Sequence, residues 1–137
     1  MFTGRVDEFF PVKYWRSYNL ELIIFNNYLI NIAGKIWSKK SEEFLNPGGH
    51  QTGYIQTHLR DNDNKSHWIL VHRAVACTFL HNPDKSIYTQ VDHLDQDKTH
   101  YHLRNLEWVT VSENNLRKNR DFDSNQLYLF EDEKRQT

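Results

Sequence analysis

Apolar and polar residues alternate in two stretches of the N-terminal half, which predicts strands rather than helices. In the first stretch, residues 20–36, apolar side chains alternate on each side of Gly34, the pattern of a hairpin or tight bend. The second stretch, residues 53–71, alternates on both sides of a polar turn at residues 61–65, which predicts a second hairpin. The aromatic-rich residues 1–20 are expected to pack on the body of the protein as an N-terminal arm.

The spacing of apolar residues then becomes helical. Positions 75, 76, 79 and 80 predict a helix within residues 72–80, and Asn82-Pro83 ends it. The expected core residues here are Val71, Val75, Cys77 and Phe79. Further along, an apolar alternation ends at Asp92-His93, and a polar loop leads to a short strand over residues 105–109. Ser112 then predicts the N-cap of a closing helix.

Length and charge place few limits on the class of protein. A chain of 137 residues forms one domain or two very small ones. The formal net charge is −1, but residues 121–137 hold five acidic and two basic residues, so the first 120 residues carry +2 from 15 bases and 13 acids. This distribution allows local basic patches, although no global charge indicates a nucleic-acid partner.

The cysteine content excludes a disulfide-stabilised or multi-cysteine zinc protein, and the short apolar runs argue against a membrane-spanning one. The single Cys77 rules out an intrachain disulfide and a zinc site built on several cysteines. The longest apolar run, residues 22–25, is too short to span a membrane, and we expect no secretory signal in the first residues. We therefore expect a cytoplasmic protein with no membrane contact, in the host cytoplasm if a phage encodes it.

The candidate chemistry lies between Val91 and Asn114. Hydrolysis of a phosphodiester by water builds negative charge on the phosphate oxygens, and a hard divalent cation held by one or two protein oxygens can neutralise it. A histidine can take the proton from the attacking water. The adjacent Asp92 and His93 would point to opposite faces of a strand, so a bend is needed for both to serve one site.

This stretch resembles the HNH endonucleases, in particular the homing enzymes of phages and group I introns. The resemblance rests on Asp92-His93, on the run from Asn105 to Thr110 and on Glu113-Asn114. A looser similarity precedes it, at residues 28–36, at Gly53-Tyr54 and at Val71-His72-Arg73. The resemblance implies a small N-terminal sheet module followed by a ββα-metal catalytic motif.

The same resemblance implies a role for each motif residue. His93 is expected to be the general base, and Asp92 and Asn114 the protein ligands of one Mg²⁺ or Mn²⁺ ion. Asn105 is expected to fix the imidazole or the loop. The residues expected to contact DNA are Lys35, Lys39, Lys40, Arg60, Arg73, Lys98, Arg104, Arg117 and Lys118.

The loop between the motif residues departs from the family pattern. The family usually has Asp-Gly-Asn-Lys followed by paired asparagines, whereas this chain has Asp95-Gln96-Asp97-Lys98 followed by Thr99-His100-Tyr101-His102. The missing glycine puts the turn geometry in question, but not the ligand set. It also raises an alternative in which His93, His100 and His102 bind zinc, although contact of this loop with DNA is favoured.

After residue 120 the chain becomes acidic and polar, which is typical of a flexible tail. Within it, residues 126–130 (QLYLF) resemble the pentapeptide with which bacterial DNA-processing proteins bind the β sliding clamp. Such a peptide would bury alternate apolar side chains in a pocket of the partner. The residues expected to contact a clamp are Gln126, Leu127, Leu129 and Phe130. The alternative is that the same residues pack back on the body as an edge strand.

The sequence therefore predicts an α+β protein with three parts. Residues 1–70 would form an arm and an antiparallel DNA-binding sheet module, residues 71–120 the ββα-metal domain and residues 121–137 the tail. The predicted function is metal-dependent cleavage of duplex DNA by a monomer or homodimer. The alternatives are a non-catalytic DNA-binding or replication-associated module and a dimeric restriction-type HNH nuclease.

Overall fold

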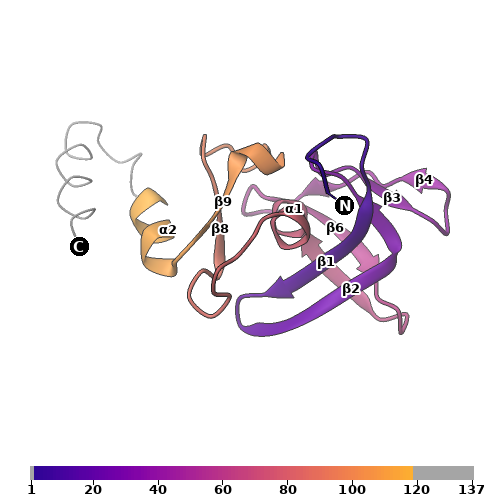
Figure 1. Cartoon of the computed structure of the whole chain (residues 1–137), viewed down its shortest axis with the longest axis horizontal. Coiled ribbons are helices and arrows are strands. Elements are labelled where there is room, and N and C mark those ends of the chain that lie inside the picture. The colour runs from indigo at the N-terminus through magenta and orange to yellow at the C-terminus, as the bar shows by residue number, and fades with distance from the viewer. Residues whose placement is uncertain (1, 119–137) are drawn as a thin grey trace.

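Residues 2–118 are described by a computed structural model, in which antiparallel strands surround one buried helix (Figure 1). The first sheet contains β1 (Phe10–Arg16), β2 (Asn19–Ile30), β3 (Ile36–Ser38) and β4 (Glu43–Phe44), in that order. The second contains β5 (Gly48–Gly49), β6 (Ile55–Arg60) and β7 (Ser66–Leu70).

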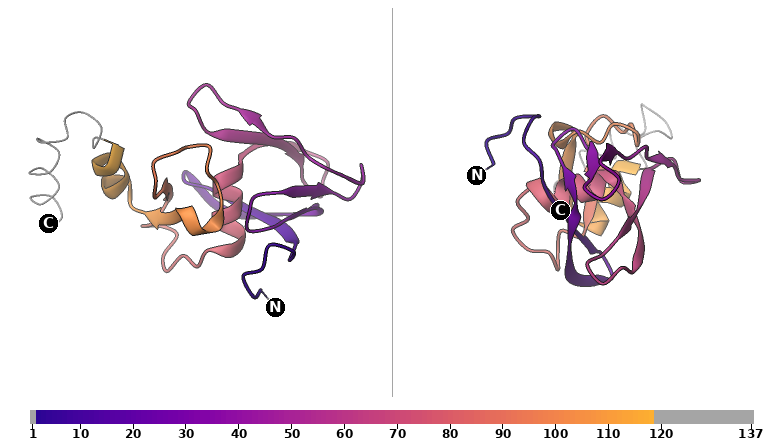
Figure 2. Two further views of the ribbon diagram at one scale, coloured as in Figure 1. Left: turned by 90° about the horizontal axis from the view of Figure 1, so that it is seen from above. Right: turned by 90° about the vertical axis from the view of Figure 1, so that its right-hand side faces the viewer.

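Helix α1 (Val71–Phe79) joins these sheets to the C-terminal segment (Figure 2). That segment consists of a two-stranded sheet of β8 (Gln90–His93) and β9 (Leu106–Val109), the short 3₁₀ helix η1 (Leu103–Asn105) before β9, and helix α2 (Val111–Lys118) after it. The predicted α+β class with a ββα unit at this end is confirmed.

The alternation of apolar residues predicted both N-terminal hairpins correctly. Strands β2 and β3 pair from Ile30 opposite Ile36, and the turn between them contains Gly34 at φ +82°. A side chain at Gly34 would also collide with the ring of Tyr101, so the turn requires glycine for space as well as for conformation. Strands β6 and β7 pair from Gln56 opposite Leu70 to Arg60 opposite Ser66.

Residues 10–16 pack on the body of the protein as expected, but as a strand of the first sheet rather than as an arm. These residues form β1, which pairs with β2 and buries Val12, Tyr14 and Trp15, each at most 3% exposed. The aromatic residues of this segment are therefore part of the main core. The Tyr14 hydroxyl accepts a hydrogen bond from the backbone N–H of Leu70 at 3.1 Å, which ties β1 to the start of α1.

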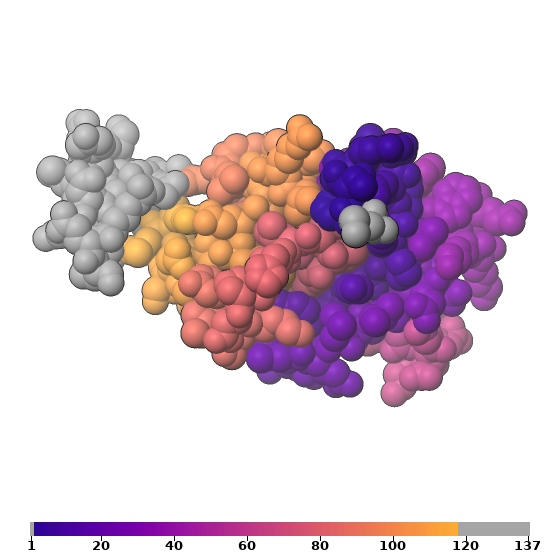
Figure 3. Space-filling model, viewed as in Figure 1, coloured from indigo at the N-terminus to yellow at the C-terminus, as the bar shows by residue number. Residues whose placement is uncertain are grey.

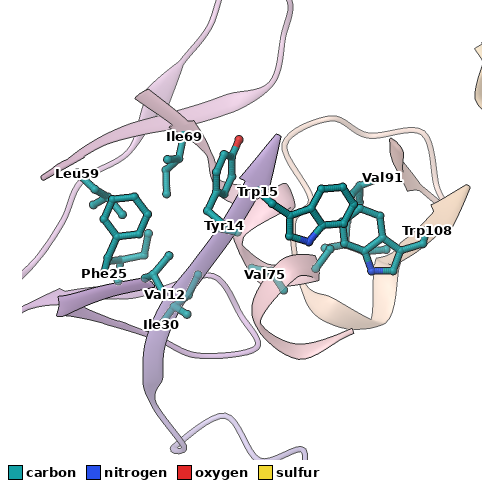
Figure 4. Packing of buried hydrophobic residues seen from close by; sticks show 14 residues of the cluster. Val12, Tyr14, Trp15, Phe25, Ile30, Leu59, Ile69, Val75, Val91 and Trp108 are labelled. Carbon is teal, nitrogen blue, oxygen red and sulfur yellow. The ribbon is translucent and has the colours of Figure 1, made fainter. Parts of the chain in front are cut away.

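One hydrophobic core extends through both halves of the chain (Figure 4). It contains Phe25 and Ile30 from the first sheet, Val75 from α1, and Val91 and Trp108 from the last sheet. The two halves also adjoin directly on the visible face of the molecule (Figure 3). The predicted boundary at residue 70 falls where β7 meets α1.

The two halves are joined by a cluster that we call the Arg73 cluster, made of Arg73, Trp15 and Trp108. The two indole rings stack at 4.8 Å with 10° between their planes. The Arg73 guanidinium lies 4.5 Å from the Trp15 ring centroid and 5.4 Å from that of Trp108. Its Nε donates to the Trp15 carbonyl at 2.6 Å, and its Nη1 donates to the Thr89 carbonyl at 2.7 Å.

The predicted clamp-binding residues, 126–130, lie outside the described residues, so that interaction stays a prediction. No helix within residues 2–118 is long and apolar enough to cross a membrane.

Replacing Arg73 by alanine should lower the free energy of unfolding by about 3 kcal/mol, because a buried space opens and two carbonyls lose their donors. Urea denaturation measures this change. Arg104→Ala is the control, because Arg104 is exposed, and it should change stability by less than about 0.5 kcal/mol. Equal, small effects of the two substitutions would show that the Arg73 cluster does not hold the halves together.

Candidate active site

A cavity of about 360 Å³ lies beside the end of β8. Its walls come from both halves of the chain, because Tyr54 precedes β6 while the other residues belong to the ββα unit. The lining residues are Tyr54, Asp92, His93, Gln96, Lys98, Asn114 and Arg117. Three of the four predicted motif residues, Asp92, His93 and Asn114, therefore share this cavity.

Asp92 and His93 are the last two residues of β8, and the chain turns directly after them. The backbone N–H of Gln96 donates to the His93 carbonyl at 2.9 Å, which closes that turn. His93 is buried, with 3% of its surface exposed, and Asp92 is half-buried. Because the chain turns at the end of β8, these two adjacent residues can line the same cavity, although they would point to opposite faces within a strand.

The His93 ring packs in an aromatic stack. Its centroid is 4.5 Å from that of His72 and 5.8 Å from that of Tyr54. The Nε2 atom is buried without a hydrogen-bond partner among the described residues. Burial lowers the pKa of His93 below its ordinary value, while the Asp92 carboxylate acts in the opposite direction. The ring is therefore neutral near pH 7, the state in which imidazole accepts a proton.

Asn105 organises the loop that follows β8. Its Nδ2 donates to Asp95 Oδ1 at 2.9 Å and to the His100 carbonyl at 2.8 Å, and its Oδ1 accepts from the Asp95 N–H at 3.1 Å. His100 donates to the same Asp95 carboxylate at 2.6 Å. Hydrogen bonds from His100, the Asp97 backbone and Asn105 hold the pKa of Asp95 at about 2. Asn105 was expected to fix either the imidazole or the loop, and its hydrogen bonds are all with atoms of the loop.

Asn114 lies in the first turn of α2, as predicted, but its helix is capped differently. Thr110 Oγ1 accepts from the Glu113 N–H at 3.1 Å, and the Glu113 carboxylate accepts from the Thr110 N–H at 3.2 Å. This reciprocal capping box makes Thr110 the N-cap, so the prediction of Ser112 was wrong. Asn114 is 7% exposed, and its side-chain amide makes no hydrogen bond to the described residues. Its oxygen is available to a ligand in the cavity.

Arg117 lies inside the site rather than on an open DNA-facing surface. Its Nη1 donates to Asp92 at 2.8 Å and to Glu107 at 2.9 Å. Asp92 and Glu107 are directly opposite each other on β8 and β9, where two like charges repel. The guanidinium neutralises this pair. It also contacts Asp92 through one oxygen only, Oδ2.

Lys98 forms part of the cavity wall. Its Nζ donates to the Thr52 carbonyl at 2.8 Å and lies 4.9 Å from the centroid of the Tyr54 ring. The contact fixes a positive charge beside Asp92 and His93. It also connects the loop after β8 to the turn before β6.

The prediction that Arg73 contacts DNA was wrong, because the side chain is 7% exposed and lies in the core. The side chain of Lys118 is outside the described part of the chain. The other basic residues predicted to contact DNA are on the surface, namely Lys35, Lys39, Lys40, Arg60 and Arg104. Lys39 and Lys40 lie in the turn between β3 and β4.

The zinc alternative finds no support in the arrangement of the histidines. His100 is bonded to Asp95, and His102 accepts from the Arg104 N–H at 3.1 Å as the cap of η1. Within residues 2–118, no three His, Cys, Asp or Glu side chains come together to hold a metal.

Sequence reasoning missed Tyr54, Gln96 and Glu107 as parts of the site. Glu107 could have been found from its position opposite Asp92 once the two strands were aligned. The sequence contains no comparable signal for Gln96, because its place in the cavity depends on the conformation of one turn. His72 is buried in α1 at 5% exposure and also contacts the His93 ring, so it belongs both to the core and to the support of the site.

Comparison with known proteins points to one class. No protein-family model matches the chain. The uncharacterized HNH endonuclease L245 of Acanthamoeba polyphaga mimivirus is 37% identical over 89 residues, 65% of this chain and 26% of that protein. The H-N-H endonuclease F-TflII of Escherichia phage T5 is 31% identical over 91 residues, 66% of this chain and 46% of that protein.

A solved structure agrees with these relatives. The structure that describes DNA binding and cleavage by the HNH homing endonuclease I-HmuI matches this chain with a TM-score of 0.64 and 25% identity. The match covers 89% of this chain and 65% of the I-HmuI chain. The chain is therefore similar to HNH endonucleases in sequence, and its fold is that of an HNH homing endonuclease. It corresponds to a quarter of the length of L245 and to about half that of F-TflII.

The His72 ring should make stability depend on pH. Burial lowers the pKa of His72 from 6.5 to about 3. Between these values the unfolded chain binds a proton that the folded chain does not, so stability falls as pH falls, by up to about 1.4 kcal/mol per pH unit.

His72→Phe should reduce the slope of stability against pH and leave the part contributed by the buried His93 ring, as measured by urea denaturation at pH 5 and pH 7. The matched control is His81→Phe, because the His81 ring is exposed and meets solvent in both states. An unchanged pH slope in His72→Phe would contradict the burial of a neutral His72.

Proposed function

We propose that this protein is a metal-dependent HNH endonuclease that hydrolyses phosphodiester bonds of double-stranded DNA. The observation that supports it best is the convergence of Asp92, His93 and Asn114 on one cavity. Each is the residue type that the family motif has at that position. The DNA substrate is inferred from I-HmuI, whose structure concerns DNA binding and cleavage.

The residues present fit one hard divalent cation. Asp92 supplies a carboxylate and Asn114 an amide oxygen, and Mg²⁺ and Mn²⁺ prefer such oxygen donors. The free Asn114 amide and the second Asp92 oxygen, Oδ1, have no competing hydrogen bond among the described residues. Two protein ligands are enough, because phosphate oxygens and waters complete the coordination. When bound, the cation neutralises the charge that develops on the phosphate.

His93 is the general base in this proposal. Its Nε2 is enclosed, so Nδ1 takes the proton from a water in the cavity. The neutral ring accepts this proton readily, and the nearby Asp92 carboxylate then favours the cationic ring. Tyr54 and His72 restrict the ring from the side that faces the N-terminal half.

Two fixed cations complete the electrostatics of the cavity. Thr52 and Tyr54 already hold the Lys98 side chain in place, so contact with a phosphate oxygen would cost little further side-chain conformational entropy. Arg117 balances the Asp92–Glu107 pair and is close enough to contribute to the positive field. Together they favour a polyanionic substrate at a site that also contains carboxylates.

The surface lysines Lys39 and Lys40 are proposed to contact the DNA backbone away from the cleavage site. They lie on an exposed turn at the far end of the first sheet, and exposed ammonium groups release counterions when they meet phosphates (Figure 1). The alternative reading as a non-catalytic DNA-binding module predicts binding of the same kind but no cleavage. Cleavage assays therefore decide between the two.

Nicking of supercoiled plasmid should require Mg²⁺ or Mn²⁺ and stop in EDTA. His93→Ala should slow it about 10²–10⁴-fold, the usual contribution of a general base. Asp92→Ala and Asn114→Ala should weaken metal binding and slow the reaction as well. His81→Ala, on the surface outside the cavity, is the control and should cleave at the wild-type rate. Wild-type nicking by a folded His93→Ala protein would overturn the proposal, and so would nicking in EDTA.

Replacing Lys39 and Lys40 together by glutamine should weaken DNA binding and reduce the dependence of affinity on salt. The slope of log K against log salt should fall by about 2, one unit for each phosphate contact. Fluorescence anisotropy of a labelled duplex at several salt concentrations measures it. Lys13→Gln with Lys65→Gln removes the same charge from other exposed positions. Identical slopes for the two double variants would show that the β3–β4 turn does not contact DNA.

A further inference from the structure

Gln96 has a backbone conformation that is costly for its residue type. Its φ of +63° is left-handed, a region that side chains with a Cβ rarely adopt. Among residues 2–118, two other residues apart from glycine share this feature, Glu42 at φ +54° and Asn64 at φ +65°. Asn64 is a residue type that tolerates this conformation, and it closes a turn with Asp61. Glu42 lies on an exposed turn.

Gln96 differs from both because it lines the cavity that contains Asp92 and His93. Its backbone N–H is bonded to the His93 carbonyl at 2.9 Å, so its Cα has a fixed position relative to His93. Glycine would form the same turn without strain, and the family motif that this chain resembles has glycine here. The turn alone therefore does not explain the glutamine.

The Gln96 amide is free to bind a ligand. Its one hydrogen bond to the described residues is from Nε2 to the Arg117 carbonyl, at 3.5 Å, the limit of such a contact. The amide is uncharged, so it does not compete with a cation for Asp92. Its N–H groups can donate to a phosphate oxygen, and Lys98 lies two residues further along the same wall.

We propose that Gln96 contacts the DNA substrate, donating a hydrogen bond from its side-chain amide to a phosphate oxygen next to the bond that is cleaved. This inference rests on the proposed nuclease function. It adds to the site a substrate contact that the family motif, with glycine, would not make.

The three left-handed residues provide a matched experiment. Gln96→Gly, Asn64→Gly and Glu42→Gly each relax the backbone at one turn, so none should lower the melting temperature. Only Gln96→Gly should slow plasmid nicking, with kcat/KM about 10–100-fold lower, the loss expected for one hydrogen bond to a charged group. Gln96→Lys should retain most activity because it restores a donor, whereas Gln96→Glu should be slower than Gln96→Gly because it repels the phosphate.

Each result has one meaning. If wild-type protein nicks DNA and Gln96→Gly nicks it equally fast, the amide makes no substrate contact and the inference is wrong. It is also wrong if Gln96→Glu and Gln96→Lys behave alike, or if Asn64→Gly slows nicking as much as Gln96→Gly. Failure of the wild-type protein to nick at all would instead refute the proposed function.

Discussion

The packing of the Arg73 guanidinium against two stacked tryptophans is the interaction on which the rest of the structure depends. Trp15 comes from β1, Arg73 from α1 and Trp108 from β9, so a single cluster joins the first sheet, the central helix and the ββα unit. Figure 4 shows the two stacked indole rings of this cluster. The carbonyls of Trp15 and Thr89 accept from two of the three guanidinium nitrogens. The third, Nη2, is buried without a hydrogen-bond partner among the described residues, so the two indole rings supply the remaining stabilisation of this charge. The position of β8, and with it the position of Asp92 and His93, follows from this cluster.

The site itself is stabilised by opposing charges. Two carboxylates face each other across the β8–β9 pair, and Arg117 from α2 bridges them. This arrangement keeps the helix that contains Asn114 against the strand that contains His93. Asn105 does the same for the loop, because its amide uses both its donor and its acceptor on loop atoms. The geometry of the candidate site thus depends on polar contacts at its edges and on aromatic packing behind His93.

Local sequence signals predicted much of the fold, and they failed where partners are distant in sequence. Both N-terminal hairpins, α1 and the order of the ββα unit follow from periodicity and from turn residues. The burial of Arg73 does not, because its acceptor on Trp15 is 58 residues away and nothing near Arg73 marks it as buried. The expectation of an arm at β1 has another cause. Strand β1 pairs with β2 across a short turn, but register shifts at Pro11/Val12 and at Tyr14/Arg16 remove a clear alternation of apolar residues. The error over the cap of α2 is different. Thr110-Val111-Ser112-Glu113 contains two possible caps, and only the contacts of Glu113 decide between them.

The close packing of Gly34 against Tyr101 has a consequence for synthesis of the protein. The turn at residues 31–35 leaves the ribosome well before its neighbour Tyr101, which is made almost 70 residues later. The Leu103 N–H also donates to the Ile32 carbonyl at 2.8 Å, so the loop between β8 and β9 packs on a turn that is synthesised earlier. The cavity can therefore form only when nearly the whole described chain has emerged. A truncated translation product that lacks the ββα unit would contain none of Asp92, His93 and Asn114, so incomplete synthesis would release no fragment with the candidate site.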